Sequence, residues 1–436
     1  MILAGPVRLA HTSCVSGSAS RPISRAEEQR LYDRALEEHQ AGRTDVAAVM
    51  LRLFIRRATA TGSRWVVARA KCTLGGILVG TDEGLGLLQE ALGEQLHGGP
   101  REDRVEAYLS MVNALWERDQ LIAALRCAFA AEDLVADSDP LAADVQLLLG
   151  ELAASLGAHT EAIDCFRKAI RLVQRSPNDR ATDTQILCQA HAAMGVTLLM
   201  EGERRQGLAA LQERLELARR LEPEEQADAH RDIAHALRDS DPALARAHLE
   251  GALALLVREP SELRSDVRRD LADLCRDAEE WAPAQRTLLA AEADLVAVGL
   301  AGSEGHGHLL TDLGLIELEL GEWGDARRNL TRAGEMLAGV DSASLRWLLA
   351  FHLGVAILLD GDAAAALPGL REARALATSL HQEDWASQVQ VYLDQAEAGA
   401  GSSGPAAPLP EWVRGLHLGE GDEPPRRPRR RPSWRR

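Results

Sequence analysis

The chain has 436 residues, a formal net charge of −17 at pH 7 and only 3% aromatic residues. So few aromatic side chains favour a core of Leu, Val, Ile and closely packed Ala, which suits helices better than sheets, and we predict no strands. Before residue 400 there are 41 basic and 62 acidic residues, so this body lacks the basic footprint that duplex nucleic acid requires.

The first segment, residues 1–24, is rich in Ser and Gly and has no helical period, so we predict that it is disordered. Arg8 interrupts its apolar run, which argues against an export signal. The longest apolar run, 347–359, has 13 residues and is too short to cross a bilayer. The six cysteines show no Cys-x2-Cys spacing, and we expect reduced thiols in a cytoplasmic protein.

One stretch, residues 144–171, shows most plainly how the chain is built. It describes two short helices with one apolar face each, and its small residues stand where two backbones must approach. Gly150 lies inside the first helix and Gly157 at the turn, while Ala162, Phe166 and Ala169 share a face of the second. We interpret this stretch as a helical hairpin.

The same spacing recurs along residues 25–380. The small residue that opens each second helix falls at Ala47, Gly84, Ala123, Ala162, Gly207, Ala245, Ala284, Ala326 and Ala366. Turn residues separate the units, as in Ser138-Asp139-Pro140 and Ser176-Pro177, so we predict nine helix pairs. Pro368 lies inside the last second helix, which we expect to start late or to bend.

Leu149-Gly150, Gly157, Ala162, Phe166 and Ala169 resemble the tetratricopeptide repeat, although the period here is nearer 40 residues than the usual 34. The resemblance implies an all-α fold, a right-handed α-solenoid of about nine helix-turn-helix repeats. An exposed last hairpin needs a lid, and residues 381–398 are predicted to form this capping helix, with Trp385, Val389 and Leu393 facing inward. Residues 399–436, rich in Pro and Arg, are predicted to be a disordered tail.

The sequence offers no catalytic, cofactor or metal motif. It contains no Gly-x-Ser-x-Gly, phosphate loop, dinucleotide fingerprint or His-Glu-x2-His. His230 and His235 are spaced by five, which does not place them on one helix face, and His306 and His308 have no nearby Cys. We therefore expect no enzyme activity, no cofactor and no metal.

The resemblance also implies a binding surface, because in such repeats the first helix of each pair lines a concave groove that holds a peptide or a partner helix. Carried over residue by residue, the candidate groove positions are Tyr32, His39, Arg69, Tyr108, Trp116, His230, Arg238, Asp266, Arg269, Asp273, Arg276, His308 and Thr311. Each could instead pack against a neighbouring hairpin or face solvent. The Lys and Asn clamp that some members use to hold a chaperone carboxylate is absent, which argues against that role.

Three functional hypotheses are consistent with these patterns. The first is a protein-interaction scaffold or adaptor that holds a partner protein or peptide in its groove. The second is a sensory or regulatory array of a bacterial signalling or transcription-regulating system, whose output domain lies elsewhere. The third is an RNA-associated accessory protein acting through residues 424–436, which carry seven Arg and no acid. That tail could also be solvated, or could fold back on its own acidic body.

Overall fold

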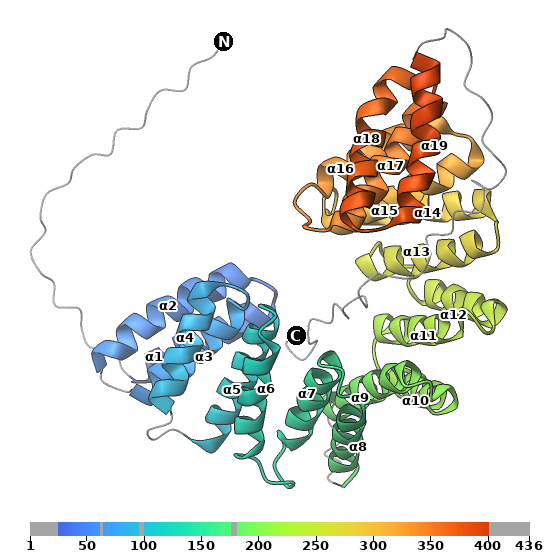
Figure 1. Cartoon of the computed structure of the whole chain (residues 1–436). Coiled ribbons are helices and arrows are strands. Elements are labelled where there is room, and N and C mark those ends of the chain that lie inside the picture. The colour runs from blue at the N-terminus through green and yellow to red at the C-terminus, as the bar shows by residue number, and fades with distance from the viewer. Residues whose placement is uncertain (1–24, 62–63, 96–99, 176–180, 401–436) are drawn as a thin grey trace, which may run out of the picture. The chain divides into compact units, whose positions relative to one another are not determined.

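The computed structural model describes residues 25–61, 64–95, 100–175 and 181–400, which form 19 α-helices and no strand (Figure 1). This confirms the all-α prediction. The predicted N-terminal segment 1–24, and the predicted tail from residue 401 onward, lie outside the described residues. None of the described helices is both long enough and apolar enough to span a bilayer.

Helices that follow one another in the sequence pack in pairs, α1 with α2 through to α17 with α18, and α19 packs on α18. The first helices are α1 (Arg25–Gln40), α3 (Arg64–Ile77), α5 (Arg101–Trp116), α7 (Ala142–Ser155), α9 (Ala181–Met200), α11 (Pro223–Leu237), α13 (Glu262–Asp277), α15 (Glu304–Leu320) and α17 (Ala343–Leu359). The second helices are α2 (Thr44–Thr61), α4 (Asp82–Gln95), α6 (Leu121–Glu132), α8 (His159–Arg175), α10 (Arg204–Ala218), α12 (Pro242–Leu255), α14 (Trp281–Ala297), α16 (Trp323–Met336) and α18 (Ala363–Ser379), and the last helix of the described residues is α19 (Glu383–Ala400).

The described helices divide into two compact units. The first unit holds α1–α6 and the second holds α7–α19. Three pairs therefore belong to the first unit, and six pairs with α19 belong to the second. The predicted helix-pair architecture and its last helix are confirmed within these units.

In five pairs, a glycine in the first helix lies against a large side chain in the second. A Cβ added to Gly150 would lie 2.5 Å from the ring of Phe166, and one added to Gly314 would lie 2.6 Å from Leu330. In both cases the two residues are 16 positions apart in the sequence. A side chain at the glycine would force the helices apart, so the glycine sets the spacing of the pair.

The second helices also bring a small residue to the contact. Ala162, Ala284 and Ala326 are fully buried, each in the first turn or so of its helix. In the third pair the buried residue is Ala124, while Ala123, expected from the repeat spacing, is only half-buried. The prediction there was wrong by one position, because adjacent alanines give the spacing no way to choose between them.

The turn inside most pairs contains one residue in the left-handed region. Gly157 has φ of +77° and Gly321 has φ of +78°. Asp119 and Glu279 adopt the same conformation at the corresponding turns, with φ of 59° and 58°. Residues with a Cβ adopt this region at some energetic cost, so the turn geometry is imposed by the packing of the helices that it joins.

We expected Pro368 to delay the start of its helix or to bend it. The start is not delayed, because α18 begins at Ala363, five residues before the proline. The side chain of Asp362 accepts a hydrogen bond of 3.0 Å from the amide of Ala365 and so caps the helix start. Pro368 then removes one helical hydrogen bond but is exposed to solvent, where the freed carbonyl can bind water.

Helix α19 covers the last pair through an aromatic contact. Trp385 stacks on Trp347 of α17 with ring centroids 4.0 Å apart, and Val389 and Leu393 are buried. Tyr392, also buried, meets Phe351 edge to face at 5.4 Å. The apolar end of the second unit is thereby shielded from water, as the terminal unit of a repeat array requires.

Gly150→Ala is expected to lower the free energy of unfolding by about 1–3 kcal/mol, because the new methyl group overlaps the ring of Phe166. The matched control is Gly334→Ala in α16, where nothing lies within 4 Å of the added carbon. This control should gain about 0.5–1 kcal/mol from helix propensity. Thermal unfolding followed by circular dichroism measures both, and two changes of the same sign would contradict the packing argument.

Candidate protein-interaction surface

The first helices of neighbouring pairs contact one another as well as their own second helices. In the second unit α7 touches α9, α9 touches α11, α11 touches α13, and α15 touches α17. We call the surface that α7, α9, α11, α13 and α15 present together the first-helix face of the second unit. Because side chains from separate pairs meet here, this face can form one continuous binding surface.

Charged side chains join α11 to α13 across this face. Arg231 pairs with Asp270, and also with Asp266 at 3.4 Å. His235 lies 3.0 Å from the same Asp270 oxygen. Nearer the ends of the helices, Arg238 binds Asp277 at 2.7 Å.

The pairing continues to the next first helix. Arg269 of α13 binds Asp312 of α15, and Arg276 holds Asp273 at 3.1 Å within α13. We call these residues together the inter-helix charge network: Arg231, His235, Arg238, Asp266, Arg269, Asp270, Asp273, Arg276, Asp277 and Asp312.

A related ion pair connects a second helix to the following first helix. Arg214 of α10 is 1% exposed and donates to the carboxylates of Asp228 and Asp232 on α11. A buried guanidinium without partners would be very costly, so both aspartates are needed where they stand. Arg214 therefore fixes α11 against the preceding pair.

The network changes the acidity of its members. Burial alone would raise the pKa of Asp270, but the hydrogen bond from His235 and the positive charge of Arg231 outweigh it and lower that pKa to about 2. For Asp266 the balance is reversed, because burial raises its pKa more than Arg231 lowers it. Asp270 therefore holds its charge more firmly than Asp266.

Asp144 of α7 differs from Asp270, because its pKa is raised and not lowered. Burial raises its pKa to about 6, its own backbone amide counteracts part of the shift, and the charge of Asp183 on α9 adds to it. No ion pair with an Arg or Lys is seen for Asp144 in the part of the chain that the structure describes. An ionised Asp144 therefore costs the fold free energy near neutral pH.

The structure brings five predicted groove residues of the second unit together in the charge network: Arg238, Asp266, Arg269, Asp273 and Arg276. Three others lie elsewhere. His230 faces its own second helix, 2.9 Å from His248 between their Nδ1 atoms. Thr311 is buried and donates to the carbonyl of Gly307, and His308 lies 3.7 Å from Glu304.

In the first unit, two predicted residues meet. The Tyr32 hydroxyl lies 2.8 Å from Thr73 Oγ1 on α3, and the guanidinium of Arg69 lies over the Tyr32 ring at 5.4 Å. Burial raises the pKa of Tyr32, so this tyrosine belongs to the core. His39 on α1, and Tyr108 and Trp116 on α5, are half-buried.

Sequence reasoning missed Arg231, Asp270, Asp312 and the buried Arg214. A signal for two of these contacts was present: Arg231 precedes Asp270 by 39 residues, and Arg238 precedes Asp277 by the same interval. Opposite charges one repeat apart lie on neighbouring first helices. A search for Arg and Asp at that separation would have identified these two contacts, but not Arg269 with Asp312, which are 43 residues apart.

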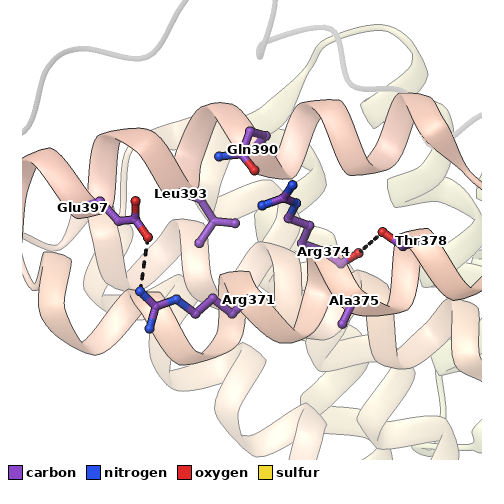
Figure 2. Close-up of a pocket in the computed structure, with 7 residues that line it drawn as sticks. All are labelled: Arg371, Arg374, Ala375, Thr378, Gln390, Leu393 and Glu397. Atoms are coloured by element: carbon purple, nitrogen blue, oxygen red, sulfur yellow. Dashed lines mark hydrogen bonds and ion pairs between the residues drawn. The ribbon is translucent and has the colours of Figure 1, made fainter.

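An open pocket lies away from this face, between α18 and α19 (Figure 2). Arg371 and Arg374 extend from α18, and Arg371 binds Glu397 of α19 at 3.1 Å. Its remaining lining comes from Ala375, Thr378, Gln390 and Leu393. Among the described residues, no group of three or more His, Cys, Asp or Glu is arranged to hold a metal ion.

No family model matches the sequence, and no curated protein matches it either. The fold is similar to the crystal structure of a Signal Transduction ATPase with Numerous Domains (STAND) protein with a tetratricopeptide repeat sensor from Pyrococcus horikoshii, with a TM-score of 0.58, 14% identity and 86% of this chain covered. The chain spans 55% of that protein's length. It is also similar to the apo form of RapI, with a TM-score of 0.56, 10% identity, and coverage of 82% of this chain and 99% of RapI. The chain thus has a tetratricopeptide-repeat-like fold.

Asp270→Asn is expected to lower the free energy of unfolding by about 2 kcal/mol at pH 7, which corresponds to the lowering of its pKa on folding. The folded chain binds this proton less tightly than the unfolded chain. The contribution of Asp270 is therefore present above about pH 4 and is lost as the pH falls toward 2. Urea unfolding across this range measures the difference, which should shrink as the pH falls.

Asp144→Asn makes the same chemical change with the opposite expected sign. Because the pKa of Asp144 is raised to about 6, removing its charge should stabilise the chain at pH 7 by on the order of 2 kcal/mol. The gain should disappear as the pH falls from about 6 toward 4, where the wild-type carboxyl takes up its proton. If both variants were destabilised equally at every pH, electrostatics would not be the cause.

Proposed function

We propose that this chain is a non-enzymatic scaffold or adaptor that binds a partner protein or peptide along its first helices. One observation carries the proposal: neighbouring first helices contact one another, so side chains from separate pairs gather on one face. Paired-helix repeats stack only on their neighbours and leave such an extended face available. The resemblance to tetratricopeptide repeats supports the interpretation of that face as the concave groove.

The chemistry of this face differs between the two units. In the second unit, α11 and α13 offer Arg and Asp side chains held in ion pairs, which favours a polar or charged partner. In the first unit, α5 offers Tyr108 and Trp116, both half-buried. Tyrosine and tryptophan are frequent anchors of protein interfaces, because they bury a large apolar area and still carry a hydrogen-bonding group.

A second candidate is a sensory or regulatory array in a cytoplasmic bacterial signalling system. The name of the STAND protein assigns its tetratricopeptide repeats to a sensor, and the fold likeness covers 86% of this chain but 55% of that protein. In this version, binding along the first helices would be read by an output domain outside the present sequence. The two candidates share the binding surface and differ only in the effect that binding has.

RNA association through residues 424–436 is a third candidate, and it rests on the sequence alone, because this tail lies outside the described residues. If this candidate is correct, the chain should retain RNA, and this retention should fall steeply with salt and disappear when the tail is deleted. The acidic body gives it no further support.

The double variant Tyr108→Ala/Trp116→Ala is expected to lose the partner that the full chain retains from a bacterial lysate. A matched control is Ile122→Ala/Phe129→Ala on α6, which removes two exposed apolar side chains from a second helix of the same unit. Quantitative mass spectrometry of the captured proteins compares the three chains. The expected loss of an anchor pair is tenfold or more, since such residues are worth about 2 kcal/mol or more each.

A partner that is lost from the α6 control and kept by the α5 variant would contradict binding along the first helices. Circular dichroism must first show that both variants are folded, because Tyr108 and Trp116 are half-buried. A chain that captures no protein at all, under conditions where it is folded, would overturn the scaffold proposal.

A further inference from the structure

Charge is distributed unequally between the two kinds of helix in the second unit. The first helices α7, α9, α11, α13, α15 and α17 carry 16 acidic and 6 basic residues. The second helices α8, α10, α12, α14, α16 and α18 carry 10 acidic and 14 basic residues. The acidity of this unit is therefore concentrated on one set of helices, whereas a charge chosen for solubility alone would be spread over both.

The six basic residues leave the first helices with a net charge of −10, and most of these Arg side chains are already engaged in ion pairs. Arg231 and Arg269 are engaged in the charge network, and Arg264 and Arg268 both reach Asp294 of α14. Two carboxylates of the charge network remain partly open to a further cation. The side chains of Asp266 and Asp277 are 44% and 42% exposed.

An apolar patch adjoins the acidic residues. Val196 and Met200 on α9 are exposed, at 44% and 57%, and α9 contacts α11. Gly195 of α9 and Ala272 of α13 occupy equivalent positions in their repeats. The residues that follow them, Val196 and Asp273, therefore lie on the same side of their helices. The ligand that fits this face is a cationic segment with an apolar anchor.

One segment of this chain has that composition. We propose that residues 424–436, PPRRPRRRPSWRR, bind the first-helix face of the second unit in cis, with Arg side chains on the carboxylates of α11, α13 and α15 and Trp434 against Val196 and Met200. This goes beyond the scaffold proposal and does not depend on it. The tail competes there with any external ligand and so sets a threshold for binding.

The chain is long enough for this contact. Residues 401–423 connect α19 to the tail, and 23 residues span at most about 80 Å when extended. From α19 to α13 there are three steps between neighbouring first helices, on the order of 30 Å at about 10 Å a step. A connector of this kind gives the tail an effective concentration approaching the millimolar range, about what weak ionic contacts require.

The test uses a fluorescein-labelled peptide of residues 424–436 and measures its binding by anisotropy. A chain lacking residues 424–436 is expected to bind the peptide at 50 mM salt, and binding should weaken about tenfold by 300 mM. The full-length chain should bind it about tenfold more weakly than the truncated chain, because its own tail occupies the face. Equal affinity for the two chains would overturn occupancy in cis.

Two triple variants of the truncated chain test the location, since any acidic protein attracts an Arg-rich peptide. D266N/D277N/E319Q removes three acids from the first helices α13 and α15. E213Q/E250Q/E335Q removes three exposed acids from the second helices α10, α12 and α16 and changes the net charge equally. We expect about tenfold weaker binding for the first and less than twofold for the second.

If both triple variants weakened peptide binding equally, the interaction would be general electrostatic attraction to an acidic protein. That result would overturn the proposed site. A peptide carrying Trp434→Ala should bind about fivefold more weakly if the indole lies on Val196 and Met200, and no change would remove that part of the proposal. Hydrogen exchange of the full-length chain against the truncated one provides a direct readout. Protection on α9, α11 and α13 supports the proposal, and protection confined to second helices contradicts it.

Discussion

In five hairpins, a glycine of the first helix lies directly against a leucine or phenylalanine of the second, and that contact sets the distance between the two helices. Gly150 has no room for a methyl group beside Phe166, and Gly354 has none beside Leu370. Dispersion and apolar burial both depend steeply on such distances, so a pair that opens slightly loses much of its packing. Because the pairs within each unit stack on their neighbours, an error in one pair would displace the next.

Stacking between pairs uses charge in addition to apolar burial. Arg214 reaches from α10 to α11, Arg231 from α11 to α13, and Arg269 from α13 to α15. Compared with apolar side chains of similar size, buried ion pairs contribute little net stability, because desolvation offsets much of the attraction, although removing one partner is costly. Their effect is on register, since a guanidinium that slipped past its carboxylates would be left unpaired. The lateral order of the first helices thus rests on a few Arg and Asp side chains.

The fold could be predicted from the sequence because its main constraint leaves a local trace. A small residue in most first helices and a large one 16 positions later recur through the chain, and helical hairpins need little else. In the third pair the pattern predicted Ala123, whereas the buried residue is Ala124. This shows the limit of the pattern, since two adjacent alanines satisfy it equally. The early start of α18 shows another, because the cap at Asp362 outweighs the proline inside the helix.

The candidate surface was harder to predict because it is made by contacts between repeats. Groove positions were assigned helix by helix, which located Asp266 and Arg269 but gave no account of their partners. Arg231 and Asp270 are 39 residues apart in sequence and are joined only when α11 and α13 stack. His230 illustrates the reverse case, since its position in α11 gave no sign that it would meet His248 of the same pair.

In the proposed function, the same ion pairs that order the first helices also prepare them for a ligand. Each paired Arg and Asp has already lost most of its side-chain freedom, so a ligand that contacts it incurs less of that entropic cost. A carboxylate can accept several hydrogen bonds, and the half-exposed Asp266 and Asp277 can admit a second cation without releasing the first. Asp270 is different, because it is buried and already accepts from Arg231 and His235. In the proposed function, aspartates at the rim of the network therefore face the ligand, while those inside hold the helices in place.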